Sequence, residues 1–589
     1  MINPIFAQDK QQHSNNTSTA LQSLTGIPYP DQPPINPKLE ATQKFWSPPA
    51  IHKVTDNVWS AVAYSLANGI MIEGTDGLII IDTGMTYEEA KNMIKELRKI
   101  EPDKPVKAII YTHGHVDHVS GAGAFVEEAK GGKVDIYAHD STLGFYVNEN
   151  ALLGPIQSQR AAMAAGALLP KEGPDKEFMG IFPVTSPGNV SFVPPTKTFS
   201  DEMDIEVAGV KLKLIHVQGE TTDHINVWMP EEKVLFIGDN SYGIVPNIYS
   251  LRGHTYRDPI GYVNALDTAI ALKPEFMVGS HQKPVSGNAN ITEILTAVRD
   301  ATQYIYDQTI RGMNQGYTAD ELAQMITLPK QLQEHPWLNQ ARGLVPWYVK
   351  QIYYGNLGWY EGDPAFLNAT SLVERSKHIV DGFGGVNQTL LKVREAIDDK
   401  DYQWASELAT YVLKFDPNNT EAKLLKAHAL RIIGQQLSAA DGRNWYLTTA
   451  LELEGKLKID PNKLSVTSPQ QLASLPVDDL LKILSTKISP VKAEGVNKTL
   501  GINFTDLNKD YTLNIRHSIL AVHDIFPQNP DMSITLDSDT YKSIVNGTQS
   551  IVNAVKSGNV KFEGNIKDLE SFVSLFDPLL MYKETTKYE

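Results

Sequence analysis

The residues with the clearest chemical potential lie in one short run, Thr112 to Gly121, which reads Thr-His-Gly-His-Val-Asp-His-Val-Ser-Gly. Alternate residues of an extended segment point to the same side, so His113 and His115 can reach one metal ion together. Asp117 and His118 fall on the turn that follows and can reach a second ion. Imidazole nitrogen and carboxylate oxygen are the ligands that zinc takes outside cysteine sites, and this chain contains no cysteine. The run therefore predicts a metal site rather than a polar loop that is histidine-rich by chance.

Three more candidate ligands, Glu220, Asp239 and His281, lie downstream of the histidine run. Each follows a run of apolar or alternating residues that predicts a strand, and a predicted helix at 258–272 separates the last two. Sheet proteins commonly gather ligand-binding groups at the C-terminal ends of strands. Taken singly, the two carboxylates are typical of solvated turns and the histidine of a strand-end hydrogen bond. Taken with the histidine run, the three residues predict a centre for two metal ions.

The combined pattern resembles the metallo-β-lactamase fold, a four-layer αββα sandwich. The upstream run Gly-Leu-Ile-Ile-Ile-Asp-Thr-Gly at 77–84 matches the strand that usually precedes the histidine loop in that superfamily. The resemblance implies that Asp82 orients the histidine loop from outside the ligand set, and that His224 is a second supporting residue. An ordinary strand-end turn is the alternative reading of Asp82.

Further motifs narrow the resemblance to the type III alkyl sulfatases, enzymes that hydrolyse dodecyl sulfate and similar esters. These motifs are Asp239-Asn240 with Asn247 and Leu251-Arg252-Gly253, Asn148-Glu149-Asn150 before Arg160, and the runs at 357–364 and 442–448. The resemblance implies a homodimer and an alkyl sulfate ester as the substrate.

The resemblance also implies two Zn²⁺ ions per chain, with a hydroxide between them as the nucleophile. One zinc would be held by His113, His115 and Glu220, the other by Asp117, His118 and His281, with Asp239 between the two. Asn247 and Arg252 would face the sulfate group, which suits a guanidinium because it can make two parallel hydrogen bonds to an oxyanion. A surface ion pair is the alternative for Arg252.

The chain departs from the family pattern in three places. The bridging carboxylate is Asp239 rather than a glutamate, His281 is followed by Gln282-Lys283 rather than His-Trp, and no tyrosine follows the pair Arg160-Ala161. We expect metal binding to survive these changes, whereas the choice of substrate can differ. Two alternatives stay open: a hydrolase of the same fold acting on a lactone, phosphodiester or thioester, and a non-catalytic lipid-binding protein with structural metals. Structural zinc sites usually close their shell with four protein ligands, often thiolates, which argues against the second.

At 589 residues the chain is too long for a single core. The predicted class is α+β multidomain, with an N-terminal arm at 1–43, the catalytic sandwich at 44–290, an all-α helical dimerisation domain at 291–460, and a small α/β sterol-carrier-protein-like domain at 461–589. Within the helical part, Ala396, Trp404 and Leu408 have the spacing of packing positions in a tetratricopeptide-like pair, although two packed helices without a repeat are equally compatible. The aromatic residues Trp359 and Trp445 are candidates for a dimer interface or for core packing.

A formal net charge of −16 provides no basic footprint for nucleic acid. An anionic ester would meet a repulsive overall field, so local positive charge must come from the metals and from Arg252. No segment of about 18 apolar residues is present, which argues against a membrane span. The short run Ile5-Phe6-Ala7 resembles the end of a secretory signal and favours a periplasmic or secreted location over a cytoplasmic one.

Overall fold

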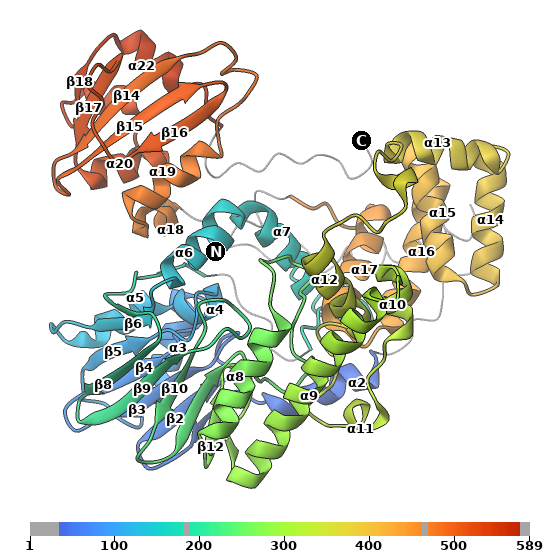
Figure 1. Ribbon diagram of the computed structural model, residues 1–589, viewed down its shortest axis with the longest axis horizontal. Helices are drawn as coiled ribbons and strands as arrows, with labels where there is room; N and C mark the ends of the chain where they lie inside the picture. Colours follow the sequence, from blue (N-terminus) through green and yellow to red (C-terminus); the bar gives the residue numbers. More distant parts are fainter. Residues whose placement is uncertain (1–34, 181–187, 461–468, 578–589) are drawn as a thin grey trace.

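The computed structural model describes residues 35–180, 188–460 and 469–577 (Figure 1). It confirms the predicted class: an N-terminal domain of two sheets is followed by a helical region and a small C-terminal sheet domain. Most of the predicted N-terminal arm, residues 1–34, and the residues that follow the predicted boundary at 460, residues 461–468, lie outside the described residues. Within the described part of the chain, no helix combines the length and the apolar character that a membrane crossing requires.

Two sheets form the centre of the N-terminal domain. The first contains β1 (Ala50–Lys53), β2 (Val58–Val62), β3 (Gly69–Glu73), β4 (Leu78–Ile81), β5 (Val106–Ile110), β6 (Asp135–His139) and β7 (Lys197–Phe199), in that spatial order. The second contains, in spatial order, β13 (Val285–Ser286), β12 (Phe276–Gly279), β11 (Val234–Gly238), β10 (Ile225–Met229), β9 (Val210–His216) and β8 (Glu202–Val207).

Strand alternation explains why four layers form. On β4, Ile79 and Ile81 pack between the sheets against residues such as Phe236, whereas Ile80 faces the opposite side. The outer face of the first sheet packs on α3 (Tyr87–Leu97) and α5 (Ala122–Val126). The outer face of the second sheet packs on α8 (Pro259–Ala271) and α9 (Asn288–Met313). Because these strands are apolar on both faces, each sheet is buried by the other sheet on one face and by helices on the other. The result is the predicted αββα sandwich.

The pairing of four strands decides where the polar residues meet. β4 runs parallel to β5, and β11 runs parallel to β12. Neighbouring parallel strands end at the same edge of a sheet, so the residues that follow them lie close together there. Asp82 follows β4, the histidine run follows β5, Asp239 follows β11 and His281 lies just beyond β12.

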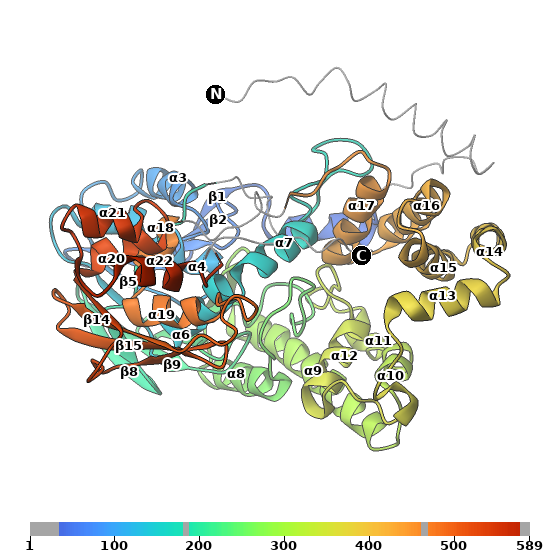
Figure 2. The same ribbon diagram turned by 90° about the horizontal axis from the view of Figure 1, so that it is seen from above.

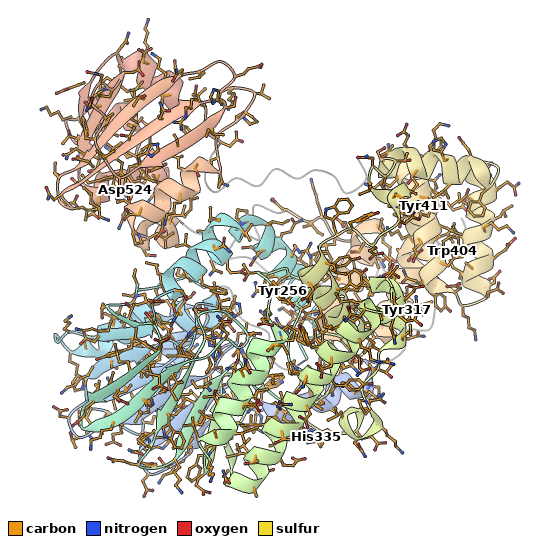
Figure 3. The ribbon with its side chains drawn as sticks, in the orientation of Figure 1. Tyr256, Tyr317, His335, Trp404, Tyr411 and Asp524 are labelled. Atoms are coloured by element: carbon orange, nitrogen blue, oxygen red, sulfur yellow. The ribbon has the colours of Figure 1, made fainter. Side chains whose placement is uncertain are left out.

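The helical region extends away from the sandwich (Figure 2). It contains α10 (Ala319–Met325), α11 (Lys330–Gln333), α12 (Val345–Leu357), α13 (Leu372–Gly382), α14 (Val386–Asp398), α15 (Tyr402–Phe415), α16 (Thr420–Gln436) and α17 (Ala440–Leu453). Ala396 and Leu408 are buried as predicted, but the packing role predicted for Trp404 is wrong, because this side chain is 41% exposed on α15 (Figure 3). Neither α14 nor α15 can include Lys400, which has a left-handed backbone with φ +64°.

The C-terminal domain is a five-stranded sheet covered by short helices. Its spatial order is β16 (Ile519–His523), β15 (Lys509–Arg516), β14 (Lys498–Phe504), β17 (Met532–Leu536) and β18 (Lys561–Glu563). The helices are α18 (Pro469–Ser474), α19 (Val477–Ser485), α20 (Ser538–Val545), α21 (Ile551–Lys556) and α22 (Ile566–Val573). Its buried apolar residues form one cluster with those of the first sheet and its helices, so this domain packs against the sandwich.

Candidate metal centre

The seven residues predicted as ligands converge in two groups at the strand ends. The first group contains His113, His115, Glu220 and Asp239, and the second contains Asp117, His118 and His281. Within each group, one nitrogen or oxygen atom per residue lies within 4.8 Å of the corresponding atom of every other member. All seven side chains are buried, although they come from four separate loops.

The donor atoms of the first group surround one point. His113 Nε2 lies 2.7 Å from His115 Nδ1, and Glu220 Oε2 lies 3.7 Å from the former and 3.4 Å from the latter. Ligands on a tetrahedral ion with bonds of about 2.0–2.1 Å would be about 3.4 Å apart. The two distances to Glu220 Oε2 are close to this value, whereas the two imidazole nitrogens lie closer together.

The second group has similar spacing, and Asp239 lies between the two. His118 Nε2 and His281 Nε2 lie 3.5 Å and 3.6 Å from Asp117 Oδ2. Asp239 directs Oδ1 to within 3.5 Å of His118 Nε2, while its Oδ2 lies 4.0 Å from His113 Nε2. One carboxylate thus reaches both groups, as a bridging ligand must.

Unsatisfied atoms provide an independent test of fit. Among the described residues, His118 Nε2, Glu220 Oε2 and Asp239 Oδ1 are buried and have no hydrogen-bond partner. Buried polar atoms without a partner are costly, and all three lie in the ligand groups. Burial lowers the pKa of His113 well below its usual range, and the nearby His118 and His115 add to the shift, so His113 is a neutral donor. These observations fit a pair of bound cations.

Asp82 lies behind the ligands and fixes the orientation of His118. Its carboxylate accepts from the Thr112 backbone N–H at 2.9 Å, the Thr112 hydroxyl at 2.8 Å and the Ser280 hydroxyl at 3.2 Å. His118 Nδ1 lies 2.8 Å from the same carboxylate, which makes Nδ1 the donor and leaves the Nε2 lone pair free for a metal. Asp82 adopts φ +56°, a strained conformation that this network maintains.

His224, the second predicted supporting residue, also lies outside both ligand groups. Its ring stacks on that of His113 with the centroids 4.9 Å apart, and its Nε2 accepts from the backbone N–H of Asp239 at 3.1 Å. Burial lowers the pKa of His224 to about 4, so the ring is neutral and can accept this hydrogen bond. His224 therefore contacts one candidate ligand and fixes the backbone of another.

Comparisons with known proteins agree with this geometry. Residues 65–281 match the model of the metallo-beta-lactamase superfamily, residues 318–456 that of alkyl sulfatase dimerisation, and residues 465–580 that of the alkyl sulfatase C-terminal domain. The chain is 36% identical over 518 residues to a linear primary-alkylsulfatase of a Pseudomonas species, and the alignment covers 86% of this chain and 98% of that protein. The chain belongs to the alkyl sulfatase family.

Two further alkyl sulfatases show that the likeness extends over all three domains. An alkyl/aryl-sulfatase of Saccharomyces cerevisiae is 30% identical over 550 residues, with 92% of this chain and 85% of that protein covered. The solved structure of an inverting sec-alkylsulfatase from Pseudomonas sp. has a TM-score of 0.88 and 28% identity, and the match covers 95% of this chain and 89% of that one.

In this alkyl sulfatase family member, the Arg252 side chain lies against His115, one of the candidate ligands. Its NH2 group is 2.9 Å from His115 Nε2, and its NH1 group donates to Gln157 at 2.9 Å and to Glu149 at 3.3 Å. Arg160 donates to the backbone carbonyls of Leu251 and Arg252 at 2.7 Å and 2.9 Å, which fixes the loop. Arg252 is therefore not a surface ion pair, because its partners line the site.

The side chain of Asn247 is hydrogen-bonded to Glu220. Its amide nitrogen donates to Glu220 Oε1 at 3.2 Å, while its own Oδ1 has no hydrogen-bond partner among the described residues. The same Glu220 oxygen accepts from the hydroxyl of Tyr242 at 3.1 Å and from NH1 of Arg257 at 2.5 Å. Sequence reasoning missed Tyr242 and Arg257, because a tyrosine in a loop and an arginine just before a helix carry no local signal of such a contact.

Proposed function

We propose that the protein hydrolyses alkyl sulfate esters, such as dodecyl sulfate, to an alcohol and inorganic sulfate at a centre of two Zn²⁺ ions. The observation that carries the proposal is the convergence of seven buried donors in two groups, beside the guanidinium of Arg252. The alkylsulfatases to which this chain is similar along most of its length supply the substrate class.

In the proposed centre, His113, His115 and Glu220 hold one ion, while Asp117, His118 and His281 hold the other. Asp239, whose two oxygens lie near His118 and His113, would bind both ions. Two bound zinc ions would supply a hydroxide nucleophile at neutral pH. The chain's own residues fix the geometry: Asp82 keeps His118 in the tautomer that can bind a metal, and His281 is held by its Nδ1, 2.8 Å from the Leu66 carbonyl.

Arg252 is proposed to receive the sulfate group. A guanidinium is permanently charged and planar, so it can bind two oxygens of the ester at once. Its NH2 group faces the ligand side of the site at His115, while its NH1 group is held by Gln157 and Glu149. The unpaired Oδ1 of Asn247 is an acceptor and cannot donate to a sulfate, so any contact between Asn247 and the ester must use its amide nitrogen, which now bonds to Glu220.

Sulfate release from dodecyl sulfate, measured with and without a chelator and alongside elemental metal analysis, tests the proposal. We expect chelator-sensitive release and about two metals per chain, the stoichiometry of a two-metal site. Arg252→Ala should raise KM for the ester while both metals stay bound, and Arg299→Ala, which removes an arginine from the outer surface of α9, is the matched control. Two bound metals without sulfate release would instead favour a hydrolase with a different leaving group, and lipid binding without any turnover would favour the non-catalytic alternative.

We also propose that the protein is a homodimer assembled through the C-terminal end of α12 and the segment that follows it. This segment lies within the stretch that matches the dimerisation model, and it exposes large apolar residues: Leu357 at 56%, Trp359 at 68% and Phe366 at 57%. Such exposure excludes core packing for Trp359 within one chain. Trp445 instead packs beside Arg160, whose guanidinium lies 5.7 Å from its ring.

Sedimentation equilibrium tests the dimer. Trp359→Asp combined with Phe366→Asp should give a monomer, because a charge placed in an apolar interface is left without water or a partner. Leu507→Asp, at a residue that is 42% exposed in the C-terminal domain, is the control and should leave the mass unchanged. A wild-type protein that sediments as a monomer would contradict the proposal.

A further inference from the structure

Glu220 is held so that only one of its oxygens is available to a metal. Oε1 accepts hydrogen bonds from Tyr242, Asn247 and Arg257, whereas Oε2 has no hydrogen-bond partner among the described residues and points at His113 and His115. A carboxylate with one oxygen saturated binds a metal through the other. The local backbone is equally constrained, because a side chain at residue 219 would collide with the Asn240 amide, which accepts from the Glu220 N–H at 3.0 Å.

Arg257 differs from the other two donors because it carries a full charge. It is 5% exposed and lies just before α8, and its NH1 group also donates to the Asn247 carbonyl at 2.6 Å. Arg257 thus contacts the far oxygen of a candidate ligand, on the side of Glu220 away from His113 and His115.

The charge of the centre indicates why such a cation is needed. Glu220, Asp239 and Asp117 are carboxylates, and together they would offset three of the four positive charges of two divalent ions. An imidazole in place of Glu220 would leave one more positive charge at the centre. Arg257 NH1 lies 2.5 Å from Glu220 Oε1, and both side chains are buried, so the guanidinium faces this carboxylate directly. The Arg257 guanidinium therefore offsets the negative charge that Glu220 brings to the centre in place of a neutral imidazole.

We propose that Arg257 is a positioning residue that makes Glu220 a competent metal ligand: it fixes the carboxylate through Oε1 and compensates its charge. The proposal rests on the two-metal centre proposed above, and it concerns metal affinity rather than contact with the ester. It follows that Glu220 and Arg257 act as a unit, so that the loss of one should be partly offset by replacing the other.

A double-mutant cycle tests this coupling, with Zn²⁺ titrated into the full-length protein in competition with a chromophoric chelator. Arg257→Gln should lower the affinity for one of the two metals by about 10–100-fold, the range typical of residues that support a ligand. Glu220→His alone should also weaken binding, because it leaves the Arg257 charge buried without its partner. The double variant Glu220→His/Arg257→Gln removes both charges and should recover most of the lost affinity.

Arg257→Lys keeps the charge and should bind metal better than Arg257→Gln, while Arg299→Gln removes the same charge from α9 and should bind both metals normally. Losses that simply add in the double variant, or a wild-type affinity in Arg257→Gln, would overturn the proposal. Thermal unfolding of each metal-free variant separates misfolding from weakened binding. Since the titration uses no ester, coupling without sulfate release would reject only the proposed function, whereas sulfate release without coupling would reject only the role of Arg257.

Discussion

The metal centre and the contact between α16 and the sandwich both bury several charges, but they satisfy them in opposite ways. At the contact, the fully buried Arg431 donates to Asp175 at 3.0 Å and makes a two-pronged pair with Glu454. Gln435 donates to the same Asp175 at 3.2 Å. The principal charges there are paired with groups of the protein itself. At the metal centre, three donor atoms, His118 Nε2, Glu220 Oε2 and Asp239 Oδ1, are buried without a hydrogen-bond partner among the described residues.

Whether buried polar atoms have protein partners thus distinguishes a structural network from a set of metal ligands, and no sequence motif is needed for the distinction. A closed network of buried charges specifies how two regions dock and leaves nothing for a ligand. A set of buried donors that are oriented but unpaired is unfavourable until a cation binds. We therefore expect substitutions in the Arg431 network to lower stability while metal is retained. Substitutions at the metal centre should lower metal content while the fold is retained.

The largest effect on the metal side is expected from His115→Ala, which removes a donor of the first group. Affinity for the first metal should fall by more than the roughly 10–100-fold that supporting residues cause, and sulfate release should be lost with it. Elemental analysis and the dodecyl sulfate assay measure both. His335→Ala is the matched control, because His335 pairs with Glu293 outside the ligand groups (Figure 3). Full turnover by a protein that has lost its metal would contradict the assignment.

The largest effect on stability is expected from Arg431→Met, which removes the ion-pair partner of the buried Asp175 and leaves Glu454 paired only with Lys456, at 3.0 Å. Removing one partner of a buried pair costs about 3–5 kcal/mol. Urea denaturation followed by the helical signal in circular dichroism should show this loss, while the metal content stays unchanged. Lys377→Met breaks an exposed pair with Asp381 on α13 and should cost about 0.5 kcal/mol or less. Equal costs for the two variants would remove the distinction between buried and exposed pairs.

A smaller effect is expected from Asp82→Asn, which keeps the shape of the side chain and tolerates the left-handed backbone. The variant loses the charge that holds His118 in its metal-binding tautomer, so metal affinity should fall by about 10–100-fold. Zinc titration against a chelator measures the change, and thermal unfolding of the metal-free protein should be altered much less. A variant that is strongly destabilised but binds metal normally would place Asp82 with the structural network instead.

The sequence was informative where candidate ligands are close together in the chain or directly follow predicted strands. Four of the seven candidate ligands lie within six consecutive residues, and the other three each follow an apolar strand, so their types and spacing predicted the convergence. The αββα layers were predicted from the resemblance to the metallo-β-lactamase fold. Trp404 was predicted wrongly because helical spacing defines a stripe of residues but not whether a neighbouring helix covers that stripe. The predicted domain boundaries and the roles of the ligands stay predictions.

The sequence by itself determined which donors exist and the order in which the strands deliver them, because ligand chemistry belongs to residue types and strand periodicity to local pattern. Only the tertiary structure decided which oxygen of Glu220 is free, that Arg257 lies behind it, and that Arg252 lies against His115. Arg252 and His115 are far apart in the chain and meet through the packing of separate loops. Such contacts depend on three-dimensional proximity, for which neither residue carries a local signal.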